Sequence, residues 1–333
     1  MNYSFIIPVF NRPDEIEELL ESFTKQTFKD PFEIVIVEDG SSITCEHIVE
    51  KYKQVLDITY YLKYNSGPGD SRNFGMQYAK GNYFIILDSD CILPPQYLAE
   101  VDRSLQEKFV DCFGGPDNML PSFTAIQKAI NFVMTSVLTT GGIRGASEKL
   151  EKFQPRSFNM GISRKAFEAS KGFSNIHPGE DPDLSIRLWK LGFQTKLISS
   201  AFVYHKRRID WEKFYIQVNK FGKVRPILNK WYPEYAKPTF YLPALFVIGL
   251  FLGIFLSIFF LSDILLQLYF GYTLIVFLVS TYVNRSLKVG FFTIIALWRQ
   301  FFGYGLGFIE SFFKINILRK KPQDAFPELF FKV

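Results

Sequence analysis

Residues 83–90 read Tyr-Phe-Ile-Ile-Leu-Asp-Ser-Asp, an uncharged apolar run that is followed at once by two carboxylates. Such a run predicts a strand that is buried on both faces of a parallel sheet. In open α/β sheets ligands bind beyond the carboxyl ends of the strands, so Asp88 and Asp90 are expected to border a crevice. Carboxylates at this position suit a hard divalent cation that also contacts phosphate, and a solvated surface turn is the alternative.

Two earlier apolar runs end in polar residues in the same way. Residues 4–9 are followed by Asn11 and Arg12, and residues 32–37 are followed by an acidic pair that includes Asp39. The segments between these runs carry apolar side chains at helical spacing. Strands that alternate with short helices predict an α/β fold with a doubly wound, mostly parallel sheet. The polar strand ends would then meet at one edge of the sheet and form a nucleotide site.

The composition changes near Lys237, beyond which the chain is strongly apolar and rich in phenylalanine. Residues 241–261 and 264–283 are each nearly uncharged and long enough to cross a bilayer. With Asp263 at the far turn, they predict a hairpin of two transmembrane helices. Basic residues flank both ends of this hairpin, namely Lys230, Lys237, Arg285 and Lys288. The positive-inside rule therefore places the preceding domain in the cytoplasm.

Residues 289–313 are apolar enough for a third span, but three polar residues interrupt them. These are Arg299, Gln300 and Glu310. A full crossing would also put the basic residues that follow on the wrong side of the membrane. We therefore expect a helix that lies in the interface or re-enters the membrane on the cytoplasmic face.

These observations divide the chain into three parts. A cytoplasmic domain is expected at 1–237 with a basic juxtamembrane segment at 206–237, then two transmembrane helices at 238–284, then an interfacial or re-entrant helix and a basic tail at 285–333. The N-terminus leads directly into a strand-like segment, so no signal peptide is expected. The three cysteines form no paired motif, which agrees with a reducing compartment.

Seven short motifs resemble, in their order along the chain, those of the family 2 glycosyltransferases with a GT-A fold. They are residues 7–12, 35–42, 67–75, 87–90, 159–167, 172–173 and 179–187. The resemblance covers about the first 225 residues. It implies an inverting transfer of one sugar from a nucleotide sugar, UDP-linked by preference or GDP-linked, to a lipid-linked acceptor in surface polysaccharide or glycolipid assembly. It also implies a multi-pass protein of a bacterial inner membrane.

The resemblance assigns the nucleotide donor to residues at the strand ends and at one helix start. Asp39 would accept hydrogen bonds from the base. Arg72 follows a glycine-rich turn at a predicted helix start, where the cation and the backbone amides both favour phosphate, although an ordinary surface arginine is the alternative. The full set is Pro8, Phe10, Asn11, Arg12, Asp39, Gly69, Arg72, Asn73, Asp88, Ser89, Asn159 and Met160.

The same resemblance implies a metal and a general base. Asp90 would ligate Mn²⁺ or Mg²⁺ through the donor diphosphate, and Asp88 would hold the ribose or the water shell of the metal. His205 would complete the metal site, although a lone histidine at a strand end is otherwise structural. Asp181 would act as general base on an acceptor hydroxyl, and Glu180 would orient the acceptor or support Asp181. Acids in a first helical turn also complement the helix dipole, which is the structural alternative.

Residues 206–230 carry many cations interleaved with aromatic side chains. Ahead of a membrane helix, attraction to anionic headgroups is a simpler explanation than binding to nucleic acid. The residues expected to contact a lipid headgroup or acceptor are Arg207, Arg208, Gln217, Lys220, Lys223 and Arg225. Processive members of the family carry Gln-X-X-Arg-Trp here, whereas residues 217–221 read Gln-Val-Asn-Lys-Phe, so we expect transfer of one sugar per encounter.

Two other functions fit the same motifs. A polyprenyl-phosphate sugar synthase would use a phosphate acceptor that needs little deprotonation, and a catalytically inactive relative would serve as a membrane scaffold.

Residues 118–138 have the spacing of an amphipathic helix, which is either part of a mobile lid on the acceptor side or ordinary core packing. A transporter is disfavoured because the predicted spans are few and carry almost no ionisable groups.

Overall fold

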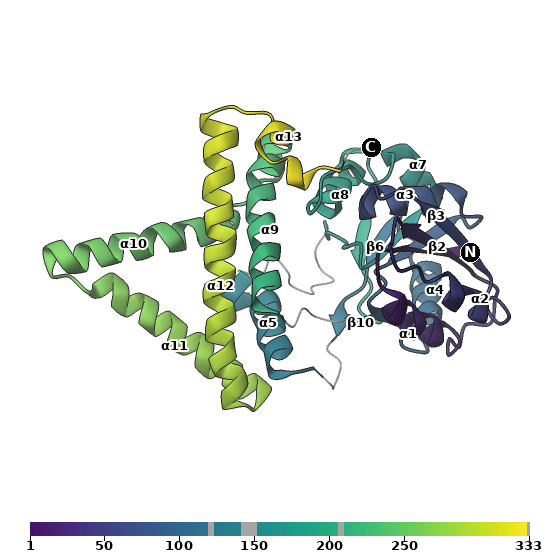
Figure 1. Cartoon of the computed structure of the whole chain (residues 1–333), viewed down its shortest axis with the longest axis horizontal. Coiled ribbons are helices and arrows are strands. Elements are labelled where there is room, and N and C mark those ends of the chain that lie inside the picture. The colour runs from purple at the N-terminus through teal and green to yellow at the C-terminus, as the bar shows by residue number, and fades with distance from the viewer. Residues whose placement is uncertain (119–122, 141–151, 206–209, 332–333) are drawn as a thin grey trace. The chain divides into compact units, whose positions relative to one another are not determined.

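The computed structural model describes residues 1–118, 123–140, 152–205 and 210–331. The chain forms two compact units, and Figure 1 labels many of their helices and strands. The first unit comprises Met1–Leu120, Ala146–Lys206 and Phe330–Val333, and the second comprises Pro121–Gly145 and Arg207–Leu329.

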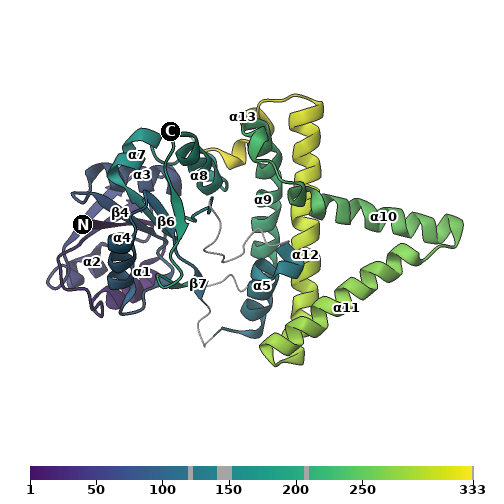
Figure 2. The same ribbon diagram turned by 180° about the vertical axis from the view of Figure 1, so that it is seen from behind.

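The first unit is built on a seven-stranded sheet with the strand order β3-β2-β1-β4-β8-β6-β9 (Figures 1 and 2). Its strands are β1 (Tyr3–Val9), β2 (Glu33–Asp39), β3 (Ile58–Lys63), β4 (Tyr83–Leu87), β6 (Cys112–Gly114), β8 (Asn159–Ser163) and β9 (Thr195–Leu197). The strands β3, β2, β1 and β4 are parallel, while β8 runs antiparallel to both β4 and β6. The mostly parallel α/β sheet predicted from the sequence is confirmed.

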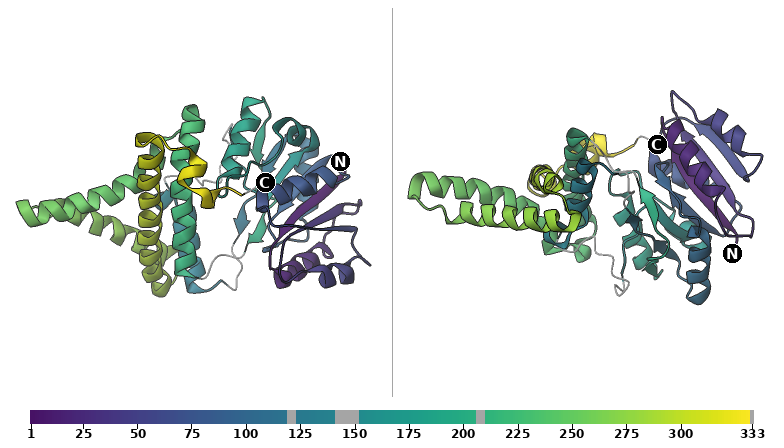
Figure 3. Two further views of the ribbon diagram at one scale, coloured as in Figure 1. Left: turned by 45° about the horizontal axis from the view of Figure 1, so that its top comes forward. Right: turned by 90° about the horizontal axis from the view of Figure 1, so that it is seen from below.

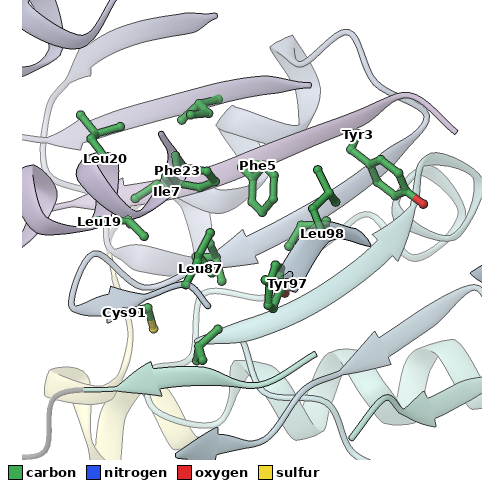
Figure 4. Close-up of a cluster of buried hydrophobic side chains, with 14 of the residues drawn as sticks. Tyr3, Phe5, Ile7, Leu19, Leu20, Phe23, Leu87, Cys91, Tyr97 and Leu98 are labelled. Carbon is green, nitrogen blue, oxygen red and sulfur yellow. The ribbon is translucent and has the colours of Figure 1, made fainter. Parts of the chain in front are cut away.

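The central strands are buried on both faces, which explains their uninterrupted apolar runs. In β1, Phe5 and Ile7 belong to one hydrophobic cluster, whereas Ile6 belongs to another on the opposite face. Figure 4 shows the first cluster, in which the ring centroids of Phe5 and Phe23 are 4.6 Å apart. Both faces of the sheet therefore need a cover of helices.

Helices supply that cover on each face, as a doubly wound fold requires. Those that contribute to the first cluster are α1 (Pro13–Phe23), α2 (Glu46–Tyr52) and α4 (Tyr97–Glu107). Those that contribute to the second are α3 (Pro68–Tyr78), α7 (Arg164–Ser170) and α8 (Glu180–Lys190).

A second, three-stranded sheet lies next to the acid pair that follows β4. Its strand order is β5-β10-β7, with β5 at Cys91–Ile92, β10 at Val203–His205 and β7 at Asp117–Asn118. β10 pairs antiparallel with β5, and the main chain of His205 lies opposite Cys91. This pairing brings the backbone of His205 beside the residue that follows Asp90.

The second unit is helical. Its main helices are α5 (Ala125–Thr135), α6 (Val137–Thr140), α9 (Trp211–Trp231), α10 (Leu242–Phe260), α11 (Ile264–Asn284), α12 (Leu287–Phe312) and α13 (Pro322–Ala325). Its shorter turns are the 3₁₀ segments Pro233–Tyr235, Pro238–Tyr241 and Pro327–Leu329 and the π-helical turn Phe313–Ile317. Within the described residues, three stretches are long and apolar enough to cross a membrane: Pro238–Phe260, Ile264–Asn284 and Leu287–Ile317.

The helix expected at 118–138 is shorter than the sequence pattern indicated. Residue 118 ends β7, residues 119–122 lie outside the described part, and α5 begins only at Ala125. Thr124 and Gln127 form a capping box, in which each side chain bonds the other's backbone N–H. This cap fixes the start of α5 at a position that periodicity alone did not mark.

α5 packs into the helical unit. Its Ile130 and Val133 share a buried cluster with Phe214 of α9 and Leu297 of α12. This contact supports the core-packing alternative for the segment. It also shows that residues far apart in the sequence, on α5, α9 and α12, build one hydrophobic core.

α9 and α12 lie side by side, as the views in Figures 1 and 3 agree. Small residues permit this close approach of two backbones. A Cβ atom added at Gly222 of α9 would lie 2.1 Å from the carbonyl oxygen of Tyr304. One added at Gly307 of α12 would lie 2.4 Å from the carbonyl oxygen of Asn219.

α10 and α11 project from α12 and converge at the turn that contains Asp263 (Figures 1 and 3). Both helices are mostly exposed, since only 17% and 11% of the most apolar 18-residue stretch of each are buried inside the protein. In α12 the buried share is 44%, because α5 and α9 pack against it. The two projecting helices are therefore the surfaces that most need an apolar environment.

The close approach of α9 and α12 leads to a stability prediction. Gly222→Ala should lower the free energy of unfolding by about 1–3 kcal/mol, because the added methyl group forces the two backbones apart. Gly271→Ala in α11 is the matched control, since no atom lies within 4 Å of its added Cβ and alanine favours a helix. Thermal unfolding in detergent, followed by circular dichroism, compares the two. Equal losses would contradict the packing described here.

Candidate active site

Arg72 lies at the centre of the candidate site. It is on the second turn of α3, after the turn at Gly67, and it is 4% exposed. Its Nη2 atom lies 2.9 Å from Oδ1 of Asp88, which follows β4, and its Nη1 atom lies 3.3 Å from Oε1 of Glu180, which begins α8. Its guanidinium carbon lies 5.3 Å from the ring centroid of Phe173. Arg72 therefore joins the end of β4 to the start of α8.

Asp90, the second acid after β4, pairs with an arginine from another element. Nη1 of Arg12, the residue before α1, lies 2.6 Å from Oδ2 of Asp90. The polar ends of β1 and β4 thus lie close together, as the predicted topology required. The side chains of Asp88 and Asp90 are 33% and 14% exposed, and Ser89 between them is buried. Both carboxylates are therefore held by cations at the rim of the sheet.

Glu180 and Asp181 are adjacent in sequence but differ in their surroundings. Glu180 is buried and accepts from Nδ1 of His177 at 2.8 Å in addition to Arg72. Burial favours the neutral acid, but the charges of His177 and Arg72 outweigh it and lower the pKa of Glu180 to about 2. Glu180 is therefore ionised throughout the physiological range.

Asp181 shows the opposite behaviour. Burial and the neighbouring Glu180 charge raise the pKa of Asp181 to about 6, against the opposing effects of Arg72 and of hydrogen bonds from Ser157. Its Oδ1 atom has no hydrogen-bond partner among the described residues. Two neighbouring carboxylates with pKa values pushed apart are typical of acid–base sites.

His177 is a site residue that the sequence analysis missed. It stands three residues before Glu180, and its imidazole is partly exposed. Its spacing from the acid pair was a usable signal, because a side chain three residues away can reach back to a helix start. The signal carries little specificity without a structure to show which way the histidine points.

Asp39 is buried at the end of β2 and holds the glycine-rich turn. Its carboxylate accepts from the backbone N–H groups of Ser66 and Gly67 at 3.0 and 2.9 Å, and from Nζ of Lys63 at 2.9 Å. These bonds fix the turn from which α3 starts. The role of Asp39 toward a nucleotide base stays a prediction.

Asn11 ties the end of β1 to the loop after β2. Its Oδ1 atom accepts from the backbone N–H groups of Ser42 and Ile43 at 2.8 and 3.1 Å, and its own φ angle is 54°. Phe10 beside it is half exposed, whereas Pro8 lies within β1 opposite Val37. Phe10 and Asn11 are thus both accessible members of this predicted group.

Several residues predicted to bind the nucleotide sugar make contacts within the fold itself. Asn73 exchanges two 2.8 Å hydrogen bonds with the backbone of Phe173. Asn159 is fully buried, where it accepts from the Tyr97 hydroxyl at 2.6 Å and donates to Ala201 at 2.8 Å. Met160 is also fully buried, and a Cβ added at Gly69 would lie 3.1 Å from the carbonyl oxygen of Ser174. Their contacts with a donor sugar stay predictions.

The predicted metal ligands converge only in part. Within the described residues, no group of three or more His, Cys, Asp or Glu side chains is placed to hold a metal ion. The expected role of the His205 imidazole concerns a side chain outside the described part, although its backbone lies near Asp90. Asp88 and Asp90 offer hard carboxylate oxygens, which here pair with the guanidinium groups of Arg72 and Arg12. Together with diphosphate and water oxygens, they make a ligand set that fits Mg²⁺ or Mn²⁺.

The residues predicted to meet a lipid headgroup belong to the second unit or lie outside the description. Arg207 and Arg208 are outside the described residues, while Gln217, Lys220, Lys223 and Arg225 lie on α9. Nζ of Lys223 pairs with Glu328 at 3.2 Å and with Glu310 at 3.6 Å. The guanidinium of Arg225 stacks 3.9 Å from the ring centroid of Phe240. Lys223 is therefore already neutralised within the unit.

Comparison with known proteins places this geometry in a family. Residues 4–169 match the family described as glycosyl transferase family 2. The poly(ribitol-phosphate) β-N-acetylglucosaminyltransferase TarS of Staphylococcus aureus is 37% identical over 114 residues, which cover 33% of this chain and 20% of that protein. The GalNAc(5)-diNAcBac-PP-undecaprenol β-1,3-glucosyltransferase of Campylobacter jejuni is 28% identical over 196 residues, covering 56% of this chain and 59% of that protein.

A solved structure supports the same fold. The mannosyltransferase PcManGT of Pyrobaculum calidifontis, in complex with GDP-mannose and Mn²⁺, has a TM-score of 0.64 at 15% identity and covers 90% of this chain and 86% of that one. The chain thus spans about a fifth of the length of TarS and most of the length of PcManGT. The motifs, the GT-A sheet and the family match agree, and this chain belongs to glycosyl transferase family 2.

Proposed function

We propose that this protein is a metal-dependent, inverting glycosyltransferase that moves one sugar from a nucleotide sugar to a lipid-linked acceptor. The observation that carries the proposal is the Arg72 network, which sets an ionised Glu180 beside an Asp181 whose pKa is raised to about 6. Asp181 is then basic enough to take a proton and still ionised at neutral pH.

In the proposed reaction, the carboxylate of Asp181 takes the proton of the acceptor hydroxyl. The acceptor oxygen forms a bond to the anomeric carbon while the bond from that carbon to the diphosphate oxygen breaks, so the configuration inverts in one displacement. Arg72 binds the diphosphate, and Glu180 stays ionised and holds Arg72 in place. A divalent cation held by Asp88 and Asp90 would supply positive charge to the departing diphosphate.

The donor class is proposed from the site and from relatives together. The ends of β1, β2 and β4 offer groups for a base, a ribose and a diphosphate at one edge of the sheet. PcManGT was solved with GDP-mannose and Mn²⁺, which supports a nucleotide sugar and a divalent metal. A UDP-sugar and a GDP-sugar are both compatible with this site.

The acceptor is proposed to be carried by the membrane. α10 and α11 would cross the bilayer as a hairpin, with residues 1–237 on the cytoplasmic side of a bacterial inner membrane. α12 would lie in the interface, which agrees with its buried share of 44% against α5 and α9. The Campylobacter relative, whose name specifies an undecaprenyl-linked substrate, supports a lipid-linked acceptor. The product would be the lipid-linked acceptor extended by one sugar, used in the assembly of a surface polysaccharide or glycolipid.

The role of Asp181 as general base can be tested by comparing the effect of its substitution on catalysis with the effect on binding of the nucleotide sugar. Asp181→Asn should lower kcat by about 10²–10⁴-fold, because the acceptor hydroxyl loses its proton acceptor. Calorimetric titration with the nucleotide sugar should give a Kd within about twofold of wild type. Retained transfer in the variant would instead favour a synthase with a phosphate acceptor.

The pKa of Asp181 also predicts how the activity of the wild-type enzyme depends on pH. Its kcat/KM should fall tenfold per pH unit below about pH 6, since only the ionised Asp181 accepts a proton.

The two shifted pKa values also predict stability effects of opposite sign. The folded state binds the Asp181 proton more tightly than the unfolded state, so stability falls as the pH rises from about 3.8 to about 6. Asp181→Asn should remove this cost and raise the free energy of unfolding at pH 8 by up to about 3 kcal/mol, with a smaller effect at pH 4.

Glu180→Gln is the matched control for this effect. The pKa of Glu180 is lowered, so its ionised form adds stability above about pH 4.5 that is lost as the pH falls toward about 2. The variant should therefore be less stable than wild type at pH 8. Denaturant unfolding at several pH values measures both variants, and equal signs at pH 8 would contradict the assigned surroundings.

Metal dependence is tested by removal and return of the ion. Chelation should abolish transfer, and Mn²⁺ or Mg²⁺ should restore it. Asp90→Asn should raise the metal concentration needed for half-maximal activity by about tenfold or more, because one carboxylate ligand is lost. Glu168→Gln, at an exposed position on α7, is the charge-matched control. Full activity after exhaustive chelation would remove the metal from the mechanism.

A further inference from the structure

The second unit contains an open cavity of about 460 Å³ that the family resemblance does not assign. It lies between the end of α9, the start of α10 and the turn after α12. The residues that matter for its chemistry are Asn229, Lys230, Tyr241, Ile315, Asn316 and Arg319. Pocket-lining side chains from three separate segments thus meet at the base of the projecting hairpin.

The cavity holds positive charge without a matching carboxylate. Nζ of Lys230 donates to the backbone carbonyl of Ile315 at 3.2 Å, and neither Lys230 nor Arg319 pairs with an acid among the described residues. Nδ2 of Asn229 is buried and has no hydrogen-bond partner in the described part of the chain. The positive charge of Lys230 and Arg319 at one cavity favours an anionic ligand there.

The backbone at one wall of the cavity is irregular. Phe313–Ile317 forms a π-helical turn, a feature that occurs frequently at functional sites. Arg319 follows it with a φ angle of 53°, which is uncommon for any residue other than glycine. These departures from a regular helix set the direction in which the chain carries Arg319 out of α12.

Exposed apolar side chains follow two of the lining residues, Tyr241 and Asn316, directly along the chain. Leu242 and Leu245, in the first turn of α10, are 50% and 58% exposed. Ile317 and Leu318, beyond the π-helical turn, are 58% and 50% exposed. Tyr241 stands between the polar and the apolar parts, as aromatic residues do at membrane interfaces. A ligand that fits both parts has an anionic head and a hydrocarbon chain.

We propose that this cavity binds the phosphate or diphosphate headgroup of a membrane lipid, whose chain lies along α10. Lys230 and Arg319 neutralise the phosphate. The proposal rests on the proposed insertion of α10 and α11 in a bilayer, and it does not depend on the sugar-transfer reaction. Lys230 lies at the end of α9, so the site is distinct from the headgroup contacts predicted earlier on that helix at residues 217–225. There Lys223 is already paired with Glu310 and Glu328.

The test titrates full-length protein in neutral detergent and reads binding by thermophoresis. The probes are dioctanoyl phosphatidylglycerol, farnesyl diphosphate, dioctanoyl phosphatidylcholine and inorganic diphosphate. The two anionic lipids should bind at least about tenfold more tightly than the other two probes, because only they offer both parts of the ligand. The double variant Lys230→Gln/Arg319→Gln should lose about tenfold or more in affinity for the anionic lipids. The stronger of the two lipids identifies a phospholipid or an isoprenoid diphosphate as the preferred head.

The matched control is Lys320→Gln/Lys321→Gln, which removes the same charge from exposed residues next to the cavity. Its affinity should stay within about twofold of wild type. Equal losses in both double variants would overturn the proposal, since any basic surface would then serve. Equal binding of inorganic diphosphate or of phosphatidylcholine would also overturn it. Flotation with phosphatidylcholine vesicles tests membrane insertion separately, so failure there would be distinguishable from failure of headgroup binding.

Discussion

The arrangement of the site depends on the buried guanidinium of Arg72. A cation removed from water is costly unless it is paired, and here Asp88 and Glu180 each supply a carboxylate. The three residues come from α3, β4 and α8, so the ion network fixes the positions of a helix, a strand end and a second helix relative to one another. Loss of Arg72 would leave the buried carboxylate of Glu180 with His177 as its remaining charged partner in this network.

The same network gives the adjacent residues Glu180 and Asp181 pKa values that are shifted in opposite directions. His177 and Arg72 keep Glu180 ionised, and the charge of Glu180 then raises the pKa of Asp181. A carboxylate held in this way is less stable than one paired with a cation, which is a common cost of a reactive group. In this site the cost is confined to Asp181, because its neighbour is fully compensated.

The helical unit follows a different principle. Glycines at 222 and 307 allow α9 and α12 to approach until backbone meets backbone, and α5 adds its apolar face to the same core. Much of the apolar surface of α12 is therefore buried against other helices of the protein, whereas α10 and α11 expose most of theirs. The cavity near Lys230 arises where these two kinds of helix meet and the end of α12 becomes irregular.

The sequence by itself determined the alternation of strands and helices, the order of the motifs and the apolar helices, because each of these is read from residues that are neighbours along the chain. Residues 83–87 are apolar without alternation since both faces of β4 are buried, and this pattern can be read directly. Only the tertiary structure decided that Arg12 pairs with Asp90, that His177 reaches Glu180, and that α5 packs with α9 and α12. Such contacts depend on how distant segments meet or on how a loop turns its side chains. The spacing along the chain placed His177 within reach of Glu180 but did not show which way its side chain points, and it carried no signal for the contacts between distant segments.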